Sequence, residues 1–107
     1  MIYFQRDFLK DRESRFVFIY IYHFKCPVLA INGDKDVQVP SKVNLPAIEK
    51  ALKKGGNNKV TTIEMPGLNH LFQECKTGLP TEYAQIEQTF SPMALDAITN
   101  WIKTNIK

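Results

Sequence analysis

Hydrophobic and polar residues follow three successive patterns through the middle of the chain. Pro27 to Asn32 (PVLAIN) is a short apolar run that ends in a glycine, typical of a strand buried on both faces of a parallel sheet. From Lys42 to Lys54 apolar residues recur at helical intervals, which predicts an amphipathic helix. Lys59 to Met65 (KVTTIEM) is rich in β-branched residues and bounded by turn residues, so it predicts a second strand. Strand, helix and strand in this order predict a right-handed βαβ unit.

The residues at the two ends of the central helix support this assignment. Asn44 is the expected N-cap, and Pro46 then falls in the first turn, where its missing N–H costs nothing. Gly55 and Gly56 provide a left-handed stop after the lysines of the last turn. The expected apolar stripe consists of Val43, Ala47, Ile48, Ala51 and Leu52.

The two ends of the chain also carry patterns. The aromatic residues of segment 1–15 are spaced as in a helix, whereas segment 16–24 is aromatic and β-branched, like a strand that must be covered on both faces. Ser91 is the expected N-cap of a C-terminal helix and Pro92 its first residue. By helical phase, Trp101 belongs to the core. The apolar stripe expected on this C-terminal helix consists of Ala94, Leu95, Ile98, Trp101, Ile102 and Ile106.

Composition places the chain among ordinary globular domains. Its 107 residues suffice for one domain with a single core, and 44% hydrophobic and 23% charged residues exclude disordered and low-complexity classes. The charged residues are interspersed and leave a net charge of +3, so we expect no nucleic-acid partner, which would require a clustered basic stripe. The longest apolar stretch, Phe16 to Phe24, is too short to span a bilayer. We expect no membrane partner, and the cytoplasm is the default location.

The cysteines and histidines do not form a metal-binding pattern. Cys26 and Cys75 lack C-x-x-C spacing, and only His23 and His70 could join them. We therefore expect no metal and no cofactor. Both cysteines are expected to pack as small hydrophobic side chains, and His23 is expected to be structural.

Two polar residues follow the predicted parallel strands, at the ends where ligands and catalytic side chains gather in such sheets. Asp36 lies four residues past the first strand, in NGDKDVQVP, and His70 lies five past the second, in MPGLNHLF. Because the crossover helix returns the chain to the same edge of the sheet, we expect the carboxylate and the imidazole to meet. They are a candidate acid–base pair.

These two segments resemble the C-terminal part of an α/β-hydrolase, particularly of the esterase and acyl-peptidase-like serine hydrolases. In that family a P-V-L-x-x-x-G-x-x-D-x-x-V-P strand and turn carries the catalytic acid, and this chain has PVLAINGDKDVQVP. A G-x-x-H segment after the last strand carries the base, and this chain has Gly67-Leu68-Asn69-His70. The resemblance covers about Lys25 to Lys107. It implies that Asp36, and not Asp34, is the acid, and that His70 is the base.

The resemblance also implies a fold and a domain division. The fold class is α/β, with a partial α/β-hydrolase-type parallel sheet of two to three strands, a βαβ unit and a closing C-terminal helix. Residues 25–107 would be the C-terminal part of the hydrolase domain, and residues 1–24 a segment of uncertain origin. The long connection after His70 is expected to be a functional loop, or partly helical around Tyr83 to Glu87.

The family's nucleophile is a serine in a G-x-S-x-G turn upstream of the acid, and this motif is missing here. Ser14, Ser41 and Ser91 are not flanked by the glycines that such a turn needs. We therefore expect a C-terminal fragment of a serine-type hydrolase of carboxylic esters or acyl peptides. It is predicted to be inactive alone. It would act on a small acyl substrate only if another polypeptide supplied the rest of the site.

The candidate residues also have structural interpretations. Asp36 is the kind of aspartate that accepts backbone N–H bonds in a turn after a strand, the role that we assign to Asp34. His70 lies beside apolar residues and also fits a hydrogen-bonded core histidine. The Asp-Lys-Asp spacing resembles a calcium loop but lacks its glycine and glutamate, which excludes calcium.

A second class of function is a non-catalytic α/β interaction module. A partial sheet has an open edge, which the N-terminal segment or a second copy of the chain must cover. We expect self-association through this edge or through Phe16 to Phe24, with the loop Leu71 to Phe90 as a further interaction surface. A G-x-S-x-G encoded just upstream would favour the hydrolase, whereas a stop codon and an independent promoter there would favour the module.

Overall fold

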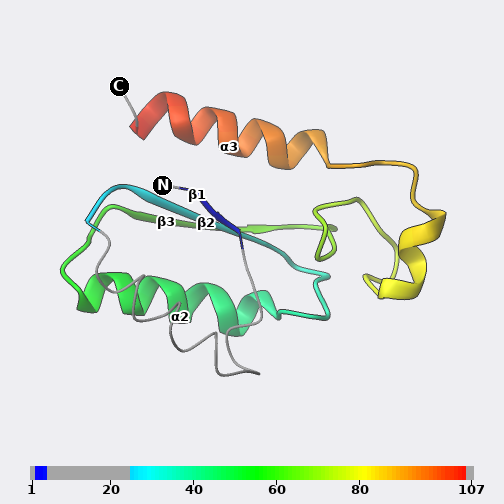
Figure 1. Ribbon diagram of the computed structural model, residues 1–107, viewed down its shortest axis with the longest axis horizontal. Coiled ribbons are helices and arrows are strands. Elements are labelled where there is room, and N and C mark those ends of the chain that lie inside the picture. Colours follow the sequence, from blue (N-terminus) through cyan, green and yellow to red (C-terminus); the bar gives the residue numbers. More distant parts are fainter. Residues whose placement is uncertain (1, 5–24, 106–107) are drawn as a thin grey trace.

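The computed structural model describes residues 2–4 and 25–105, which form a mixed α/β fold of three layers (Figure 1). The sheet of the described residues is parallel, with strand order β1-β2-β3. Helix α2 covers one face of this sheet and helix α3 covers the other. The elements are β1 (Ile2–Phe4), β2 (Val28–Gly33), α2 (Ser41–Lys54), β3 (Val60–Met65), the 3₁₀ helix η1 (Pro80–Gln85) and α3 (Pro92–Asn105).

Strand β1 corrects the helix prediction at residues 2–4, while residues 1 and 5–15 of that segment lie outside the described residues. The spacing in segment 1–15 predicts a helix, yet Ile2–Phe4 pairs in parallel with β2, with Ile2 opposite Leu29. Isoleucine, tyrosine and phenylalanine favour extended backbone, and the edge of β2 offers hydrogen-bond partners that a short isolated helix would lack. The strand predicted over residues 16–24, with His23, lies outside the described residues.

Strands β2 and β3 confirm the two predicted strands at the centre of the fold. They pair in parallel from Val28 opposite Val60 to Gly33 opposite Met65, and α2 is the crossover between them. All six residues of β2 are buried, as its continuous apolar run predicts. Both strands end at the same edge of the sheet, so the loops that follow them start side by side (Figure 1).

Helix α2 begins before its predicted N-cap. The N-cap position is occupied by Pro40, whose extended backbone leads into the helix at Ser41, and Asn44 lies buried inside the helix. Pro46 is therefore the sixth residue of α2, not part of its first turn, and removes the bond that an N–H there would donate to Lys42. The prediction was wrong because Asn44 uses its side chain in a buried contact with β2 and not as a cap.

The buried face of α2 also differs from the predicted stripe. Ile48 and Leu52 are fully buried as expected, but Val43 is 50% exposed and Leu45 takes its place in the core. The buried face of α2 runs at helical spacing through Ser41, Asn44, Leu45, Ile48 and Leu52, which leaves Val43 to one side of it. At the other end Gly56 has a φ of +90° and its N–H bonds to Lys53, which confirms the predicted left-handed stop.

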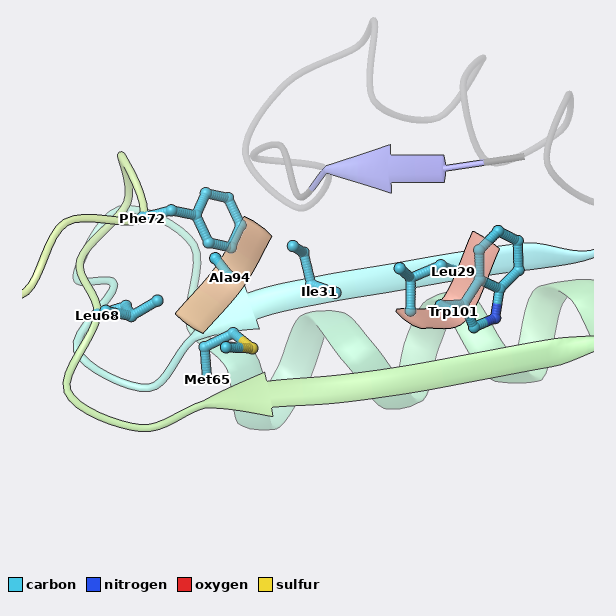
Figure 2. Close-up of a cluster of buried hydrophobic side chains, with 7 residues drawn as sticks. All are labelled: Leu29, Ile31, Met65, Leu68, Phe72, Ala94 and Trp101. Carbon is cyan, nitrogen blue, oxygen red and sulfur yellow. The ribbon is translucent and has the colours of Figure 1, made fainter. Parts of the chain in front are cut away.

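Two apolar clusters pack against opposite faces of β2. Val28 and Ala30 face α2 and pack against Leu45, Ile48 and Leu52. Leu29 and Ile31 face α3, as Figure 2 shows. Their cluster is completed by Met65, Leu68, Phe72, Ala94 and Trp101. Each large apolar side chain buried in this way contributes about 1.5–3 kcal/mol, so the two clusters hold β2 and its carboxyl end firmly in place.

Helix α3 starts as predicted. Its first residue is Pro92, and the Ser91 hydroxyl accepts the N–H of Met93 at 3.2 Å, which confirms Ser91 as the cap. Trp101 is 6% exposed, as its helical phase predicts, and its Nε1 donates to the hydroxyl of Thr61 at 3.1 Å. The indole therefore anchors the end of α3 to β3.

The apolar stripe predicted for α3 is wider than the face that the sheet buries. Ala94 and Trp101 are buried, but Leu95 and Ile102 are 51% and 37% exposed. Ile106 lies outside the described residues. The prediction for Leu95 and Ile102 was wrong because a narrow sheet covers only part of the helix circumference.

The connection between β3 and α3 contains the 3₁₀ helix η1. It spans Pro80–Gln85 and so begins and ends slightly before the helical segment predicted around Tyr83 to Glu87. Figure 1 places η1 beyond the carboxyl ends of the strands. Among the helices described, none has the length and apolar character that a membrane span requires.

Candidate acid–base site

Asp36 lies in the turn that follows β2, where it is 5% exposed. Its Oδ1 accepts the N–H groups of Gln38 at 2.9 Å and of Val39 at 2.8 Å. These two bonds fulfil the structural role expected of an aspartate in a turn. They engage only one of the two carboxylate oxygens, which leaves the other to serve a second role.

The second oxygen contacts the predicted partner. His70, in the loop after β3, places its Nδ1 2.9 Å from Asp36 Oδ2, although the two residues are 34 positions apart. The carboxylate side chain is fully buried, whereas the imidazole is 25% exposed. The prediction that the two loops bring these residues together is therefore confirmed.

The ionisation of Asp36 determines which histidine nitrogen carries the proton. Burial raises the pKa of the Asp36 carboxyl, but the hydrogen bond and charge of His70 and the N–H groups of Val39 and Gln38 outweigh burial and hold that pKa below its usual 3.8. An ionised carboxylate only accepts hydrogen bonds, so His70 Nδ1 is the donor. In the neutral imidazole Nε2 then carries the lone pair, as a general base requires.

The loop that bears His70 packs directly against the end of β2. A Cβ on Gly33 would lie 2.2 Å from the backbone oxygen of Leu68 and 2.7 Å from that of Asn69. Such contacts are far closer than side chains tolerate, so glycine is needed at this position for the loop to approach. This close approach brings His70 within hydrogen-bond distance of the Asp36 turn.

The His70 loop is held by the residue before the histidine. Asn69 is fully buried; its Oδ1 accepts the N–H groups of Leu71 and Gln73, and its Nδ2 donates to Gln73 Oε1. Phe72 has a φ of +59°, an uncommon conformation for a non-glycine residue, while its ring is buried in the cluster of Figure 2. The loop is therefore fixed by a buried amide on one side of His70 and a buried ring on the other.

Two buried asparagines that were not predicted as site residues connect Asp36 to the interior of the protein. Asn32, the fifth residue of β2, is fully buried; its Nδ2 lies 3.4 Å from Asp36 Oδ2 and 3.1 Å from the backbone oxygen of Val39. Asn44 of α2, 2% exposed, donates to Asn32 Oδ1 at 2.9 Å. A continuous set of polar contacts thus leads from α2 through β2 to Asp36 and His70.

A signal for this contact is present in the sequence. Alternation along β2 places Asn32 on the same face as Val28 and Ala30, toward α2. Asn44 lies one turn before Ile48, on the helix face that packs there. The two amides therefore continue the apolar rows of strand and helix and meet at the carboxyl end of β2.

Asp34 has the structural role that the sequence analysis assigned to it. It is exposed, and its Oδ1 accepts the N–H of Gly67 at 2.7 Å, which links the turn after β2 to the turn after β3. Asp36, and not Asp34, contacts the imidazole.

The two cysteines differ from one another. Cys26 is exposed, so the prediction that it packs as a small hydrophobic side chain was wrong; it precedes β2 and lies outside both apolar clusters. Cys75 is half-buried, and its thiol contacts the backbone oxygen of Gly67 at 3.5 Å. Burial, and then the nearby Glu82 carboxylate, raises the pKa of the Cys75 thiol, so it is protonated at neutral pH and is a poor nucleophile.

The two serines among the described residues both serve the fold. The Ser41 hydroxyl donates to Glu64 of β3, and the Ser91 hydroxyl caps α3. Both serines are buried. Ser14, the third serine of the chain, lies outside the described residues.

Helix η1 approaches the Asp36 turn through a tyrosine. The Nε2 of Gln38 donates to the hydroxyl of Tyr83 at 2.5 Å. The pKa of Tyr83 is raised, mainly by burial. The hydrogen bond from Gln38 lowers this pKa, and the neighbouring Asp36 carboxylate raises it further. The long connection after His70 therefore packs back against the turn that carries the acid.

A surface hollow of about 470 Å³ lies beside η1, but it is not centred on the pair. Its lining residues are Glu74, Cys75, Lys76, Glu82, Gln85, Ile86, Glu87 and Gln88. The Glu82 carboxylate is occupied by the N–H groups of residues 76–78 and the hydroxyl of Thr77. In the part of the chain that the structure describes, no three His, Cys, Asp or Glu side chains gather as metal ligands would.

Comparisons with known proteins gave no match: neither a protein-family model, nor a curated protein, nor a solved structure is significantly similar to this chain.

Proposed function

We propose that the chain is the acid–base segment of a hydrolase that acts on carboxylic esters or acyl peptides, with Asp36 and His70 as its acid and base. The observation that carries this proposal is the 2.9 Å contact between Asp36 Oδ2 and His70 Nδ1 at the carboxyl ends of two parallel strands. The P-V-L-x-x-x-G-x-x-D-x-x-V-P and G-x-x-H resemblance supports the same roles.

The geometry suits proton transfer in acyl hydrolysis. His70 Nε2 would take the proton of an attacking hydroxyl while the hydroxyl oxygen bonds to the acyl carbon. It would then give that proton to the leaving group as the bond between the acyl carbon and the leaving group breaks. Asp36 keeps the Nδ1 proton in place and stabilises the imidazolium that forms between these two steps. Its lowered pKa keeps the carboxylate ionised throughout the neutral range.

The nucleophile and the oxyanion-hole donors would come from another polypeptide segment. The 107 residues contain no G-x-S-x-G, and the hydroxyls of Ser41 and Ser91 already serve the fold. Without the nucleophile, an acid and a base retain little of the catalysis of a complete triad. The chain alone is therefore inactive under this proposal.

Fluorophosphonate labelling, read by intact mass, tests the proposal in two steps. The chain alone is expected to gain no adduct, and a stoichiometric adduct lost in His70→Ala would overturn the claim that the nucleophile lies elsewhere. The chain is then produced together with the polypeptide encoded directly upstream. A serine adduct on that polypeptide that disappears with His70→Ala would support the hydrolase, and an adduct unaffected by His70→Ala would refute it.

A second candidate function is a self-associating interaction module, and the sheet edge favours it. Strand β3 pairs with β2 on one side, and the structure describes no strand on its other side. Residues 60–63 of β3 are half-buried, and a second copy that paired along this edge would cover them further. The oligomeric state in solution tests this function.

A further inference from the structure

We propose that Asn32, anchored by Asn44, is a positioning residue for the Asp36–His70 pair. Its side-chain amide holds the Asp36 carboxylate in the orientation in which Oδ2 faces the imidazole. The catalytic meaning of this role rests on the proposed function, but the positioning itself is measurable without hydrolysis.

Four contacts hold the two oxygens of the Asp36 carboxylate, two on each side. Oδ1 accepts the backbone N–H groups of Gln38 and Val39, while Oδ2 lies beside His70 Nδ1 and Asn32 Nδ2. A carboxylate can otherwise turn about its last side-chain bond, because that torsion is broad. With donors on both oxygens, such a turn would break contacts on both sides at once.

Asn32 also holds the turn itself. Its Nδ2 lies 3.1 Å from the backbone oxygen of Val39, the residue whose N–H bonds to Asp36 Oδ1. Asn32 and Asp36 thus bond to the two backbone polar groups of Val39, its oxygen and its N–H. The carboxylate and the turn that carries it are positioned by one amide.

Asn44 determines which way that amide points. It donates to Asn32 Oδ1 at 2.9 Å, so the oxygen of Asn32 faces α2 and the nitrogen faces Asp36. The reverse orientation would place the amide oxygen against an ionised carboxylate and against the backbone oxygen of Val39, with repulsion at both. Because Asn44 belongs to a helix packed against β2, this orientation is built into the scaffold.

The side-chain amides of Asn32 and Asn44 are buried next to apolar side chains. They adjoin the apolar cluster of β2 and α2 that contains Ala30 and Ile48. Leucine would fill such positions without any need for a polar partner. Asn32 Nδ2 contacts Asp36 Oδ2 and the backbone oxygens of Gly33 and Val39, so the asparagine pair is linked to the turn that carries the acid.

The experiment compares His70 tautomers by two-dimensional ¹⁵N–¹H NMR of the imidazole, with the signals assigned by a His70→Gln variant. The wild type is expected to show the Nδ1–H form. Asn32→Leu is expected to shift His70 toward the Nε2–H form, since the carboxylate is free to turn away. The matched control is Asn57→Leu, a buried asparagine near the start of β3 that bonds to Cys26 and Lys59.

A loss of the Nδ1–H form in Asn32→Leu but not in Asn57→Leu supports positioning, because both variants lose a buried amide. The wild-type tautomer in both variants, or the same shift in both, would overturn it.

A second variant keeps the test decisive if Asn32→Leu does not fold. Asn44→Ala leaves β2 intact and removes only the group that orients Asn32, so it should give a smaller shift in the same direction, with Asn57→Ala as its control. An Asn44→Ala tautomer identical to the wild type would contradict the proposal. Labelling that does not depend on His70 would refute the hydrolase alone and leave this measurement valid.

Discussion

At the scale of single residues, Asp36 combines two roles on its two oxygens. Oδ1 closes the turn after β2 and Oδ2 contacts His70, so the structural and the catalytic interpretations of this aspartate are compatible. The sequence located Asp36 and His70 because each follows a strand at the same edge of a parallel sheet. It did not reveal the contribution of Asn32, whose role depends on a partner from α2.

Replacement of Asp36 by Asn is expected to lower the free energy of unfolding by about 2 kcal/mol at pH 7, the scale of a hydrogen bond to a charged group. The folded-state pKa of Asp36 lies below its usual 3.8, so the ionised carboxylate stabilises the fold above that value. This contribution is lost as the pH falls through the lowered folded-state pKa.

Urea unfolding of wild type and Asp36→Asn between pH 7 and pH 3 checks this prediction. The difference between the two is expected to shrink as the pH falls below about 4, where the carboxylate becomes protonated. The lowered pKa values of Glu64 and Glu82 cancel in the comparison, because both variants retain these residues. Asp34→Asn is the matched control. A difference that does not shrink between pH 4 and pH 3 would contradict the role given to Asp36.

Gly33→Ala is expected to destabilise the protein by about 3 kcal/mol, near the upper end of the usual cost of overpacking. The added Cβ would meet backbone oxygens of Leu68 and Asn69, which cannot move without displacing the His70 loop. Gly67→Ala is the control, since its φ is +76° but nothing lies within 4 Å of its Cβ, and about 1–2 kcal/mol is expected there. Equal losses in urea unfolding would count against the close approach at Gly33.

At the scale of elements, the two central strands and the C-terminal helix could be predicted well from the sequence. The apolar run of β2, the β-branched run of β3 and the capped α3 lie where the sequence places them. The failures are at Ile2–Phe4 and at the start of α2. In both places tertiary contacts outweigh the local sequence pattern. Pairing with β2 makes residues 2–4 extended. The Asn44 side chain bonds to Asn32, so Asn44 lies inside α2 and does not cap it.

Pro46→Ala is expected to raise the free energy of unfolding by about 1 kcal/mol. Alanine restores an N–H to the helix interior and removes the proline ring, a gain partly offset by the greater freedom of the unfolded chain. Urea unfolding measures the change, with Pro40→Ala, just before the helix, as the control that should give no gain. A lower stability of Pro46→Ala would contradict the cost that we assign to a proline inside α2.

At the scale of the whole molecule, two helices sandwich a parallel sheet and place both candidate loops at one edge (Figure 1). The sequence predicts this arrangement because parallel strands must be joined by a crossover. It could not predict which apolar residues of α3 stay exposed, since that depends on how far the sheet extends beneath the helix.

Self-association through the edge of β3 predicts a concentration-dependent mass in light scattering, rising toward twice the monomer mass. Thr62→Lys, in the middle of β3, should shift the protein toward monomer, because a charge on an edge strand opposes pairing between copies. Thr104→Lys, on the exposed face of α3, is the matched control and should leave the mass unchanged. A monomer at every concentration would exclude the interaction module in this form.

The central claim is that a buried carboxylate holds His70 with its proton on Nδ1, ready to act as a base through Nε2. The most direct test is the imidazole ¹⁵N–¹H spectrum of His70 at neutral pH in the wild type and in Asp36→Asn. We predict the Nδ1–H form in the wild type and its loss in Asp36→Asn, with the fold retained. The Nε2–H form in the wild type, or a tautomer that does not respond to Asp36→Asn, would contradict the acid–base pair.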